Sequence, residues 1–433
     1  FFLFVLRGNT QEVEILTLED CLRIGIDNNL SLEGKRKEIQ RSKYGVSENR
    51  SKLLPQINAI AGYSNNFDPP VSVTDGSSYG VPYNITQTLQ HSANAGLEMQ
   101  MPLFNQTLYT SMSIAKVMEE ISRLSYGKAR EDVILQISKM YYLGQVTAEQ
   151  IMLIKANITR LEELRDITQA FFDNGMSMEV DLKRVNINLE NLKVQYDNAQ
   201  AMMKQQLNML KYIMDYPAEK EIALTPVNTD SITTVALTGL SENIYELQLS
   251  QSQVQLAERQ KKIITNGYIP SLSLTGSWRY AAYTDKGYHW FHSGPSNQWF
   301  RSYGVGLTLR IPIFDGLDKT YKIKKAMIDI ENKRLAWEDA RKNLQTQYLN
   351  AVNDLMNNQR NFKKQKDNYL LAEDVYAVTS DRYREGIASM TEVLQDEMQM
   401  SEAQNNYISA HYNYRVTNLM LLKLTGQIES LVK

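Results

Sequence analysis

Two long stretches of the chain lack the residues that break helices, with no proline and little glycine. The stretches run from about residue 106 to 173 and from about 317 to 383, and neither contains a proline. At 1.5 Å per residue, each would be a helix on the order of 100 Å long. A compact domain has no use for helices of that length, so the pattern predicts a mainly helical protein that is not one ordinary globular domain.

A second helix with a coiled-coil seam follows each long stretch, after a glycine turn. Apolar or small residues recur in it at alternating steps of three and four, which is how paired helices pack. The seam positions are Met178, Leu182, Val185, Leu189, Leu192, Tyr196, Ala199, Met203 and Leu210, with Gln206 interrupting, and then Met400, Ala403, Tyr407, Ala410, Tyr414 and Leu421. We interpret both seams as packing surfaces. Helices at about 18–53 and 178–213 together match one long helix in length.

Four segments switch from this helical spacing to strict alternation of apolar and polar residues. They lie at about 56–65, 91–102, 271–281 and 302–312, and polar loops at about 65–90 and 282–300 join them in pairs. An ordinary half-buried sheet shows the same alternation. The length of the segments is also that of a strand that crosses a membrane at a tilt.

The charges and aromatic residues of these strands favour the membrane. Glu98, Arg279 and Arg310 all fall on the polar face, and the apolar face carries no such charge. Aromatic residues lie near the ends that adjoin the loops, as at a membrane interface: Tyr63, Trp278, Tyr280 and Tyr303. Four strands cannot close a barrel, and open strand edges in lipid are very costly, so the sequence predicts that the chain forms an oligomer.

The chain repeats its own landmarks in one order. Two helix–strand junctions, a glycine turn and a helix end recur about 210 residues later, which indicates a structural duplication. The predicted parts are an N-terminal segment at 1–15, a first repeat at 16–213 with its helical hairpin at about 105–213, a linker at 214–240, a second repeat at 241–425 with its hairpin at about 316–425, and a tail at 426–433.

Composition narrows the class of protein. The net charge of −2 excludes a general basic surface for nucleic acid. Cys21 is the single cysteine, so no disulfide can form within the chain, and its place in an amphipathic helix predicts a small buried residue. The apolar run at 1–6 is interpreted as the tail of a signal peptide, which would imply export.

Enzyme motifs are absent from the sequence. It contains no nucleophile elbow, phosphate loop or zinc-type spacing of Cys and His, so we expect no catalysis and no cofactor. His289 and His292 lie close together, but no third ligand accompanies them, and we interpret this segment as an aromatic surface loop without a metal.

Several segments, taken in order, resemble the TolC-like outer membrane efflux proteins. They are LTLEDCL at 16–22, LPQ at 54–56, MPLFN at 101–105, IPIFDG at 311–316 and RYREGIASMTEVL at 382–394. The resemblance covers about 410 residues, with both repeats in order. It implies an α+β fold of long helices, in which an α-helical barrel in the periplasm joins a transmembrane β-barrel shared by three chains, each giving four strands.

The same resemblance implies a passive outer-membrane channel in a Gram-negative bacterium. Such a homotrimer contacts outer-membrane lipid and works with a periplasmic adaptor and an inner-membrane pump, in efflux or in type I secretion. The residues expected at the adaptor-contacting tips are Gly175, Met176, Ser177, Gly386, Ile387 and Ser389. The glycines permit a left-handed backbone, and Ser177 and Ser389 are expected to cap the returning helices. Glu98, Arg279 and Arg310 are expected to line the barrel lumen.

A periplasmic gate is also implied by the resemblance. Asp181 and Tyr383 stand where family members carry a hydrogen-bonded pair that helps to close the tunnel, and Glu392 is expected in a ring of three carboxylates. Two positions differ from some members: Ala388 replaces an arginine, and Gln395 replaces a second acid. A soluble coiled-coil scaffold is the alternative function, although it leaves the two strand pairs unexplained.

Overall fold

A computed structural model describes residues 13–68, 71–75, 83–87, 89–226, 239–241, 243–284 and 299–432. The chain divides into two compact units. One comprises Phe1–Ile39, Ser122–Gln251 and Leu335–Lys433, and the other comprises Gln40–Ile121 and Ser252–Arg334. The units cut across the two sequence repeats, because the long helices α3 (Gln106–Asp173) and α6 (Asp318–Arg384) each contribute to both.

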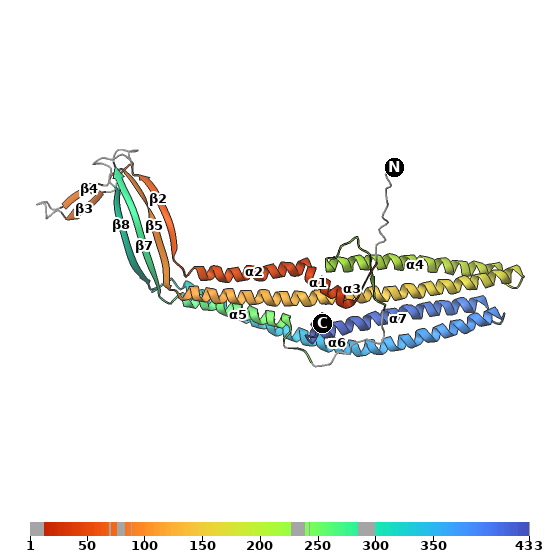
Figure 1. Cartoon of the computed structure of the whole chain (residues 1–433). Helices are drawn as coiled ribbons and strands as arrows, with labels where there is room; N and C mark the ends of the chain where they lie inside the picture. Colours follow the sequence, from red (N-terminus) through yellow and green to blue (C-terminus); the bar gives the residue numbers. More distant parts are fainter. Residues whose placement is uncertain are drawn as a thin grey trace, which may run out of the picture. The chain divides into compact units, whose positions relative to one another are not determined.

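The second unit holds a four-stranded antiparallel sheet and the helical segments that lead into it (Figure 1). Its strands are β2 (Gln56–Asn65), β5 (His91–Phe104), β7 (Ser271–Thr284) and β8 (Trp299–Arg310), and they lie side by side in the order β2-β5-β7-β8. The helices beside them are α2 (Leu30–Ser51) and α5 (Tyr245–Asn266), together with the ends of α3 and α6. All four strands that the alternation predicts are therefore present.

One segment predicted as a loop contains additional strands. β3 (Val71–Asp75) and β4 (Tyr83–Gln87) pair as a separate hairpin between β2 and β5. The loop prediction for about 65–90 is wrong over these residues. Val71 and Val73 are β-branched and alternate with polar residues, which is typical of a strand. The pattern extends over only five residues and follows two prolines, so the sequence favoured a loop.

The first unit is a helical bundle with a small pair of strands. It contains α1 (Leu18–Asn28), α4 (Glu179–Met214), α7 (Met390–Leu424), most of α3 and α6, and a C-terminal 3₁₀ helix, η2 (Ile428–Val432). β1 (Glu14–Leu16) pairs in parallel with β6 (Ile222–Leu224). Residues 14–16 thus form a strand beside the segment after α4. Residues 1–6, which are interpreted as the tail of a signal peptide, lie outside the described residues.

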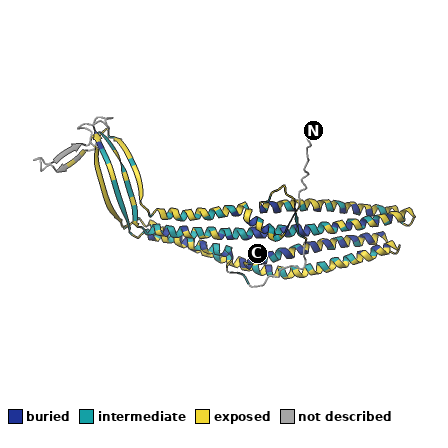
Figure 2. Cartoon of the chain, in the orientation of Figure 1, coloured by how far each residue is buried: buried dark blue, intermediate teal, exposed yellow. Residues whose placement is uncertain are grey.

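Buried residues concentrate in this bundle, while the strands are mostly half-buried or exposed (Figure 2). The predicted seam of α4 is buried at Val185, Leu189, Leu192, Ala199 and Leu210, because these residues pack in the helical cores. The interrupting Gln206 is buried with them. Among the described residues, no helix is both long and apolar enough to cross a membrane.

The predicted single helix at about 18–53 is broken at Asn29. Its side-chain oxygen accepts the Leu32 backbone N–H at 3.1 Å, and its side-chain nitrogen donates to the Ile213 carbonyl at 2.7 Å. Asn competes well with the helix for backbone groups, so it ends α1 and starts α2. Cys21 on α1 is fully buried, and burial raises the pKa of its thiol to about 12, as suits a core residue.

Candidate functional site

Two helix-to-helix turns in the first unit share one backbone geometry. Gly175 and Gly386 have φ values of +73° and +75°, the left-handed conformation that the sequence predicts for both. In the first turn the Met176 N–H donates to Phe171 O at 2.8 Å, and in the second Ile387 donates to Arg382 O at 2.8 Å. This is the Schellman ending of a helix, which accounts for the glycine in each turn.

Apolar side chains stand exposed at both turns. Met176 is 68% exposed and Ile387 is 63% exposed. Each follows its glycine directly, so the two turns present one apolar residue at the same place in the same backbone. Such residues are available for contact with another protein.

The helix caps after the two turns differ. Ser389 caps α7 as predicted, and its hydroxyl accepts the Glu392 N–H while the Glu392 carboxylate accepts the Ser389 N–H. The prediction for Ser177 is wrong, because the N-cap of α4 is Met178, which has no side-chain hydrogen bond. Met178 occupies the place of Ser389, since the two turns are in the same register from their glycines onward.

The structure gives Asp181 and Tyr383 different partners within the chain. The Tyr383 hydroxyl lies 3.3 Å from the Thr168 hydroxyl, and the Tyr383 ring packs against Phe171 with 5.6 Å between the ring centroids. Asp181 faces Arg184, one turn along α4, at 3.4 Å. These are the partners within one chain, and the hydrogen bond between Asp181 and Tyr383 that the resemblance implies stays a prediction for the assembled channel.

Arg184 is a residue that the sequence reasoning missed. Its guanidinium lies 3.4 Å from the Asp181 carboxylate and donates to the Thr391 hydroxyl at 3.3 Å, so it links α4 to α7 next to Glu392. The step of three residues from Asp181 to Arg184 could have indicated the ion pair. No local pattern indicated that Thr391 would lie opposite.

Two ion pairs join α3 and α6 in the part of the bundle that leads to the turns. Arg160 contacts Glu373 at 3.0 Å, and Arg384 contacts Glu163 at 3.4 Å. Arg160 also donates to the Met400 sulfur at 3.1 Å. Burial raises the pKa of Glu397, which lies beneath this surface, and the Arg160 charge opposes that shift.

In the second unit, the sheet register places Arg301, opposite Tyr280, on one face and Glu98, Arg279 and Arg310 together on the other. Arg279 pairs with Glu98 across β7 and β5, and Arg310 lies opposite Ser271 on that same face. Gly304 leaves space on this face, because the atom nearest to where its Cβ would lie is the Ser277 hydroxyl at 4.0 Å. A recess of about 480 Å³ there is lined by Asn58, Glu98, Gln100, Thr275, Ser277 and Arg279, among others.

The opposite face of the sheet is apolar apart from Arg301 and is exposed in the single chain. Tyr303, Val305, Leu307 and Leu309 of β8 are between 60% and 80% exposed, and Leu97 and Trp278 continue the face across the sheet. No group of three or more acidic, His or Cys side chains that could hold a metal occurs among the described residues. His289 and His292 lie outside them.

Comparison with known proteins matches this arrangement to one family. The family model described as outer membrane efflux protein matches residues 24–214 and 236–427, which is most of the chain. The chain belongs to the outer membrane efflux protein family. It is therefore a subunit of an outer-membrane efflux channel, with its strands in the outer membrane and its helices in the periplasm.

Individual relatives of this efflux channel subunit have low sequence identity, but the alignments cover most of both chains. Outer membrane protein TolC of Vibrio cholerae is 21% identical over 399 residues, which cover 88% of this chain and 84% of the relative. The probable efflux pump outer membrane protein TtgC of Pseudomonas putida is 23% identical, with coverage of 94% and 82%.

Solved structures share the fold. The structure of CusC superposes with a TM-score of 0.79 at 16% identity and covers 98% of this chain and 95% of its own. VceC of Vibrio cholerae superposes with a TM-score of 0.75 at 14% identity, with coverage of 94% and 96%. Long paired helices joined to four strands are therefore the fold of these channels.

Proposed function

We propose that three copies of this chain form the exit duct of a tripartite efflux or type I secretion system. The observation that supports this proposal most strongly is the sheet, which has an exposed apolar face. Among the described residues, each of its edge strands, β2 and β8, has a hydrogen-bonded neighbour on one side only. Unpaired strand edges are not tolerated in lipid, so the β8 edge of one chain has to pair with the β2 edge of the next.

Disulfide cross-linking tests this shared barrel. Asn58 and Thr308 lie on the polar face, each at the third position from the helix-side end of an edge strand. A chain carrying Asn58→Cys and Thr308→Cys should give a covalent ladder that ends at three chains under mild oxidation in outer membranes. The control pairs Asn58→Cys with Ser277→Cys on the central strand β7, and it should give no ladder. A ladder from both pairs, or from neither, would argue against closure through β2 and β8.

The proposed duct is passive and carries no catalytic group or cofactor. An inner-membrane pump would supply the energy, and a periplasmic adaptor would dock at the two turns around Gly175 and Gly386. The exposed Met176 and Ile387 support this docking role. The names of relatives such as TtgC, an efflux pump outer membrane protein, support efflux as the process. The matched stretches 24–214 and 236–427 support the division into repeats at 16–213 and 241–425.

We place the periplasmic gate at Asp181, Tyr383 and Glu392, and the barrel lumen at Glu98, Arg279 and Arg310. Arg184 supports the gate, because it joins Asp181 of α4 to Thr391 of α7. Loss of that link should let the helix ends separate. The channel carrying Arg184→Ala is expected to conduct more current in a planar bilayer than the parent, while Lys183→Ala, which removes an exposed pair with Glu179, should not. Equal conductance of all three would contradict this gate.

A further inference from the structure

The helix–strand junctions of the second unit expose large apolar side chains. Leu54, Ile311, Ile313 and Phe314 lie in the short connections and are between 56% and 94% exposed. Tyr268, which precedes β7, is 42% exposed. Large exposed apolar groups in water are unfavourable, and aromatic residues next to membrane strands are typical of the lipid interface. The junctions therefore mark where the protein leaves the apolar part of the membrane.

Basic residues dominate the helix ends directly beyond these junctions. Seven lie in the last turns of α5 and the first turns of α6, against the two acids Glu258 and Asp318: Arg259, Lys261, Lys262, Lys319, Lys322, Lys324 and Lys325. The chain as a whole is slightly acidic, with a net charge of −2. This local excess of positive charge is thus a feature of the junction.

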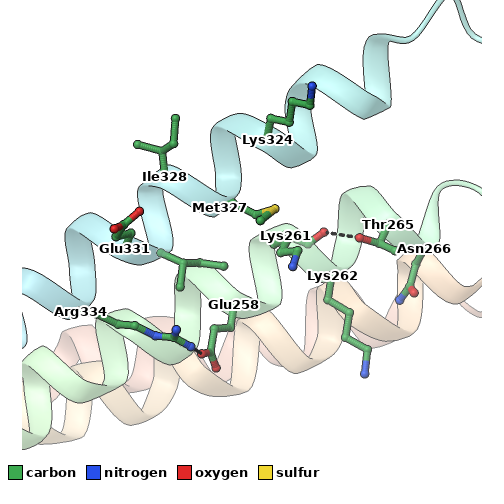
Figure 3. Close-up of a pocket in the computed structure, with 11 residues that line it drawn as sticks. Glu258, Lys261, Lys262, Thr265, Asn266, Lys324, Met327, Ile328, Glu331 and Arg334 are labelled. Carbon is green, nitrogen blue, oxygen red and sulfur yellow. Dashed lines mark hydrogen bonds and ion pairs between the residues drawn. The ribbon is translucent and has the colours of Figure 1, made fainter.

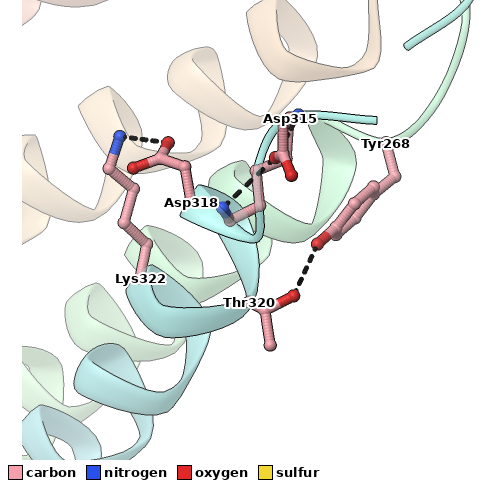
Figure 4. A network of polar contacts seen from close by, with 6 residues as sticks. Tyr268, Asp315, Asp318, Thr320 and Lys322 are labelled. Carbon is pink, nitrogen blue, oxygen red and sulfur yellow. Dashed lines mark hydrogen bonds and ion pairs between the residues drawn. The ribbon is translucent and has the colours of Figure 1, made fainter. Parts of the chain in front are cut away.

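Two of these lysines are occupied in holding the turn into α6. Lys319 contacts Asp315 at 2.8 Å, and Lys322 contacts Asp318 at 2.7 Å (Figure 4). The Tyr268 hydroxyl lies 3.4 Å from the Thr320 hydroxyl in the same network. These contacts fix the start of α6 against the residues before β7.

Other lysines line a groove between α5 and α6. The groove has a volume of about 960 Å³, and its lining includes Lys261, Lys262 and Lys324 with Met327 and Ile328. In Figure 3 the Lys262 and Lys324 side chains extend to opposite sides of the helix pair. The acidic residues of the groove are Glu258, which pairs with Arg334 at 2.7 Å, and Glu331. Along their helices, both lie farther from the sheet than the three lysines do. The part nearest the sheet has three ammonium groups that take part in none of the ion pairs found among the described residues.

We infer that this groove binds the phosphate headgroup of an anionic phospholipid in the periplasmic leaflet of the outer membrane. Lys262 and Lys324 lie within about two helical turns of the ends of α5 and α6 that adjoin the strand junctions, which is within reach of the headgroup layer. Clustered lysines beside a membrane segment attract anionic lipid. Apolar side chains at the junction and in the groove add contact for the lipid's glycerol backbone and upper chains. This inference rests on the membrane location and not on the proposed cargo or gate.

Lipid binding to the full-length protein in dodecyl maltoside tests the inference by native mass spectrometry. The probes are phosphatidylglycerol and phosphatidylcholine with identical acyl chains. The parent protein should prefer phosphatidylglycerol by at least about tenfold, and added salt should weaken that preference. Lys261→Gln, Lys262→Gln and Lys324→Gln together should reduce it to about twofold or less. The matched control is Lys204→Gln, Lys363→Gln and Lys364→Gln, three exposed lysines of the other unit, which should keep the parent preference.

Three results would overturn the inference. One is equal binding of the two lipids by the parent. Another is an equal loss of preference in the groove variant and the control, which would point to net charge alone. The third is displacement of phosphatidylglycerol by millimolar inorganic phosphate, which would make the groove a site for a free anion. Channel conductance is measured separately, so failure of lipid binding and failure of the duct proposal remain distinguishable.

Discussion

Ser389 and Glu392 cap each other at the start of α7. The Glu392 N–H donates to the Ser389 hydroxyl at 3.3 Å, and the Ser389 N–H donates to the Glu392 carboxylate at 3.1 Å. The corresponding start of α4 has Met178 and no side-chain cap. Two turns with the same backbone thus begin their second helices with different local stability, because a capping box satisfies two backbone donors. Glu392 therefore has a structural role as well as the proposed one in the gate.

Removal of this cap should loosen the start of α7. Ser389→Ala is expected to lower the local opening free energy by about 1 kcal/mol. Amide exchange in the first turn of α7 should therefore become about fivefold faster. Met178→Ser is the reciprocal variant, and it should slow exchange at the start of α4. Hydrogen exchange followed by mass spectrometry measures the exchange rates at both helix starts. Unchanged exchange in both variants would show that packing, and not capping, controls the turns.

Asn29 should matter far more than its neighbour Asn28. Asn29→Ala removes the cap of α2 and leaves the Ile213 carbonyl without its 2.7 Å bond, so we expect a loss of about 1–3 kcal/mol. Asn28 is exposed, and Asn28→Ala should change stability by less than about 0.5 kcal/mol. Thermal unfolding of the two variants provides the comparison. Similar midpoints would contradict the role given to Asn29.

The sequence was most informative where a single physical signal extends over many residues. The two long helices appear at 106–173 and 318–384 because no proline or cap interrupts them. Strict alternation also places Glu98, Arg279 and Arg310 on one face, whereas Arg301, which the structure adds to β8, lies on the other. The missed features depend on one side chain or on a distant partner. Asn29 breaks a helix by bonding Ile213, and Arg184 meets Thr391 from another helix. Contacts between helices far apart in sequence leave no local pattern.

Gly96 should be irreplaceable in β5, unlike Gly304 in β8. A Cβ at Gly96 would lie 2.4 Å from the Trp278 carbonyl oxygen and 2.9 Å from the Arg279 Cα, and these backbone atoms cannot turn away. At Gly304 the nearest atom, the Ser277 hydroxyl, is 4.0 Å away. We expect Gly96→Ala to cost about 1–3 kcal/mol and to reduce assembled protein in the outer membrane. Gly304→Ala should assemble as the parent does, and equal yields would count against this register.

Glu131 should make stability depend on pH. Burial raises the pKa of this carboxyl to about 7, although Lys423 opposes the shift, and Glu429 and Asp132 add to it. The folded state therefore binds more protons than the unfolded state between pH 4.5 and 7, and stability falls as pH rises through that range. The loss above the range is at most about 3 kcal/mol.

Glu131→Gln should flatten this part of the pH profile and raise stability at neutral pH. Thermal unfolding midpoints between pH 4.5 and 7.5 measure the effect, with Glu120→Gln, an exposed acid on α3, as the control. The control should retain the pH dependence of the parent. A profile for Glu131→Gln that parallels the parent would show that this carboxyl is ionised in the folded protein.

The mass of the assembly in a mild detergent tests the shared channel most directly. Protein extracted from outer membranes should run as three chains of 49.7 kDa, about 150 kDa in all, and should resist dissociation until it is heated, because four strands close a barrel only between chains. Recovery of a 49.7 kDa monomer from the soluble fraction without detergent would contradict the account, and would leave the coiled-coil scaffold as the better description.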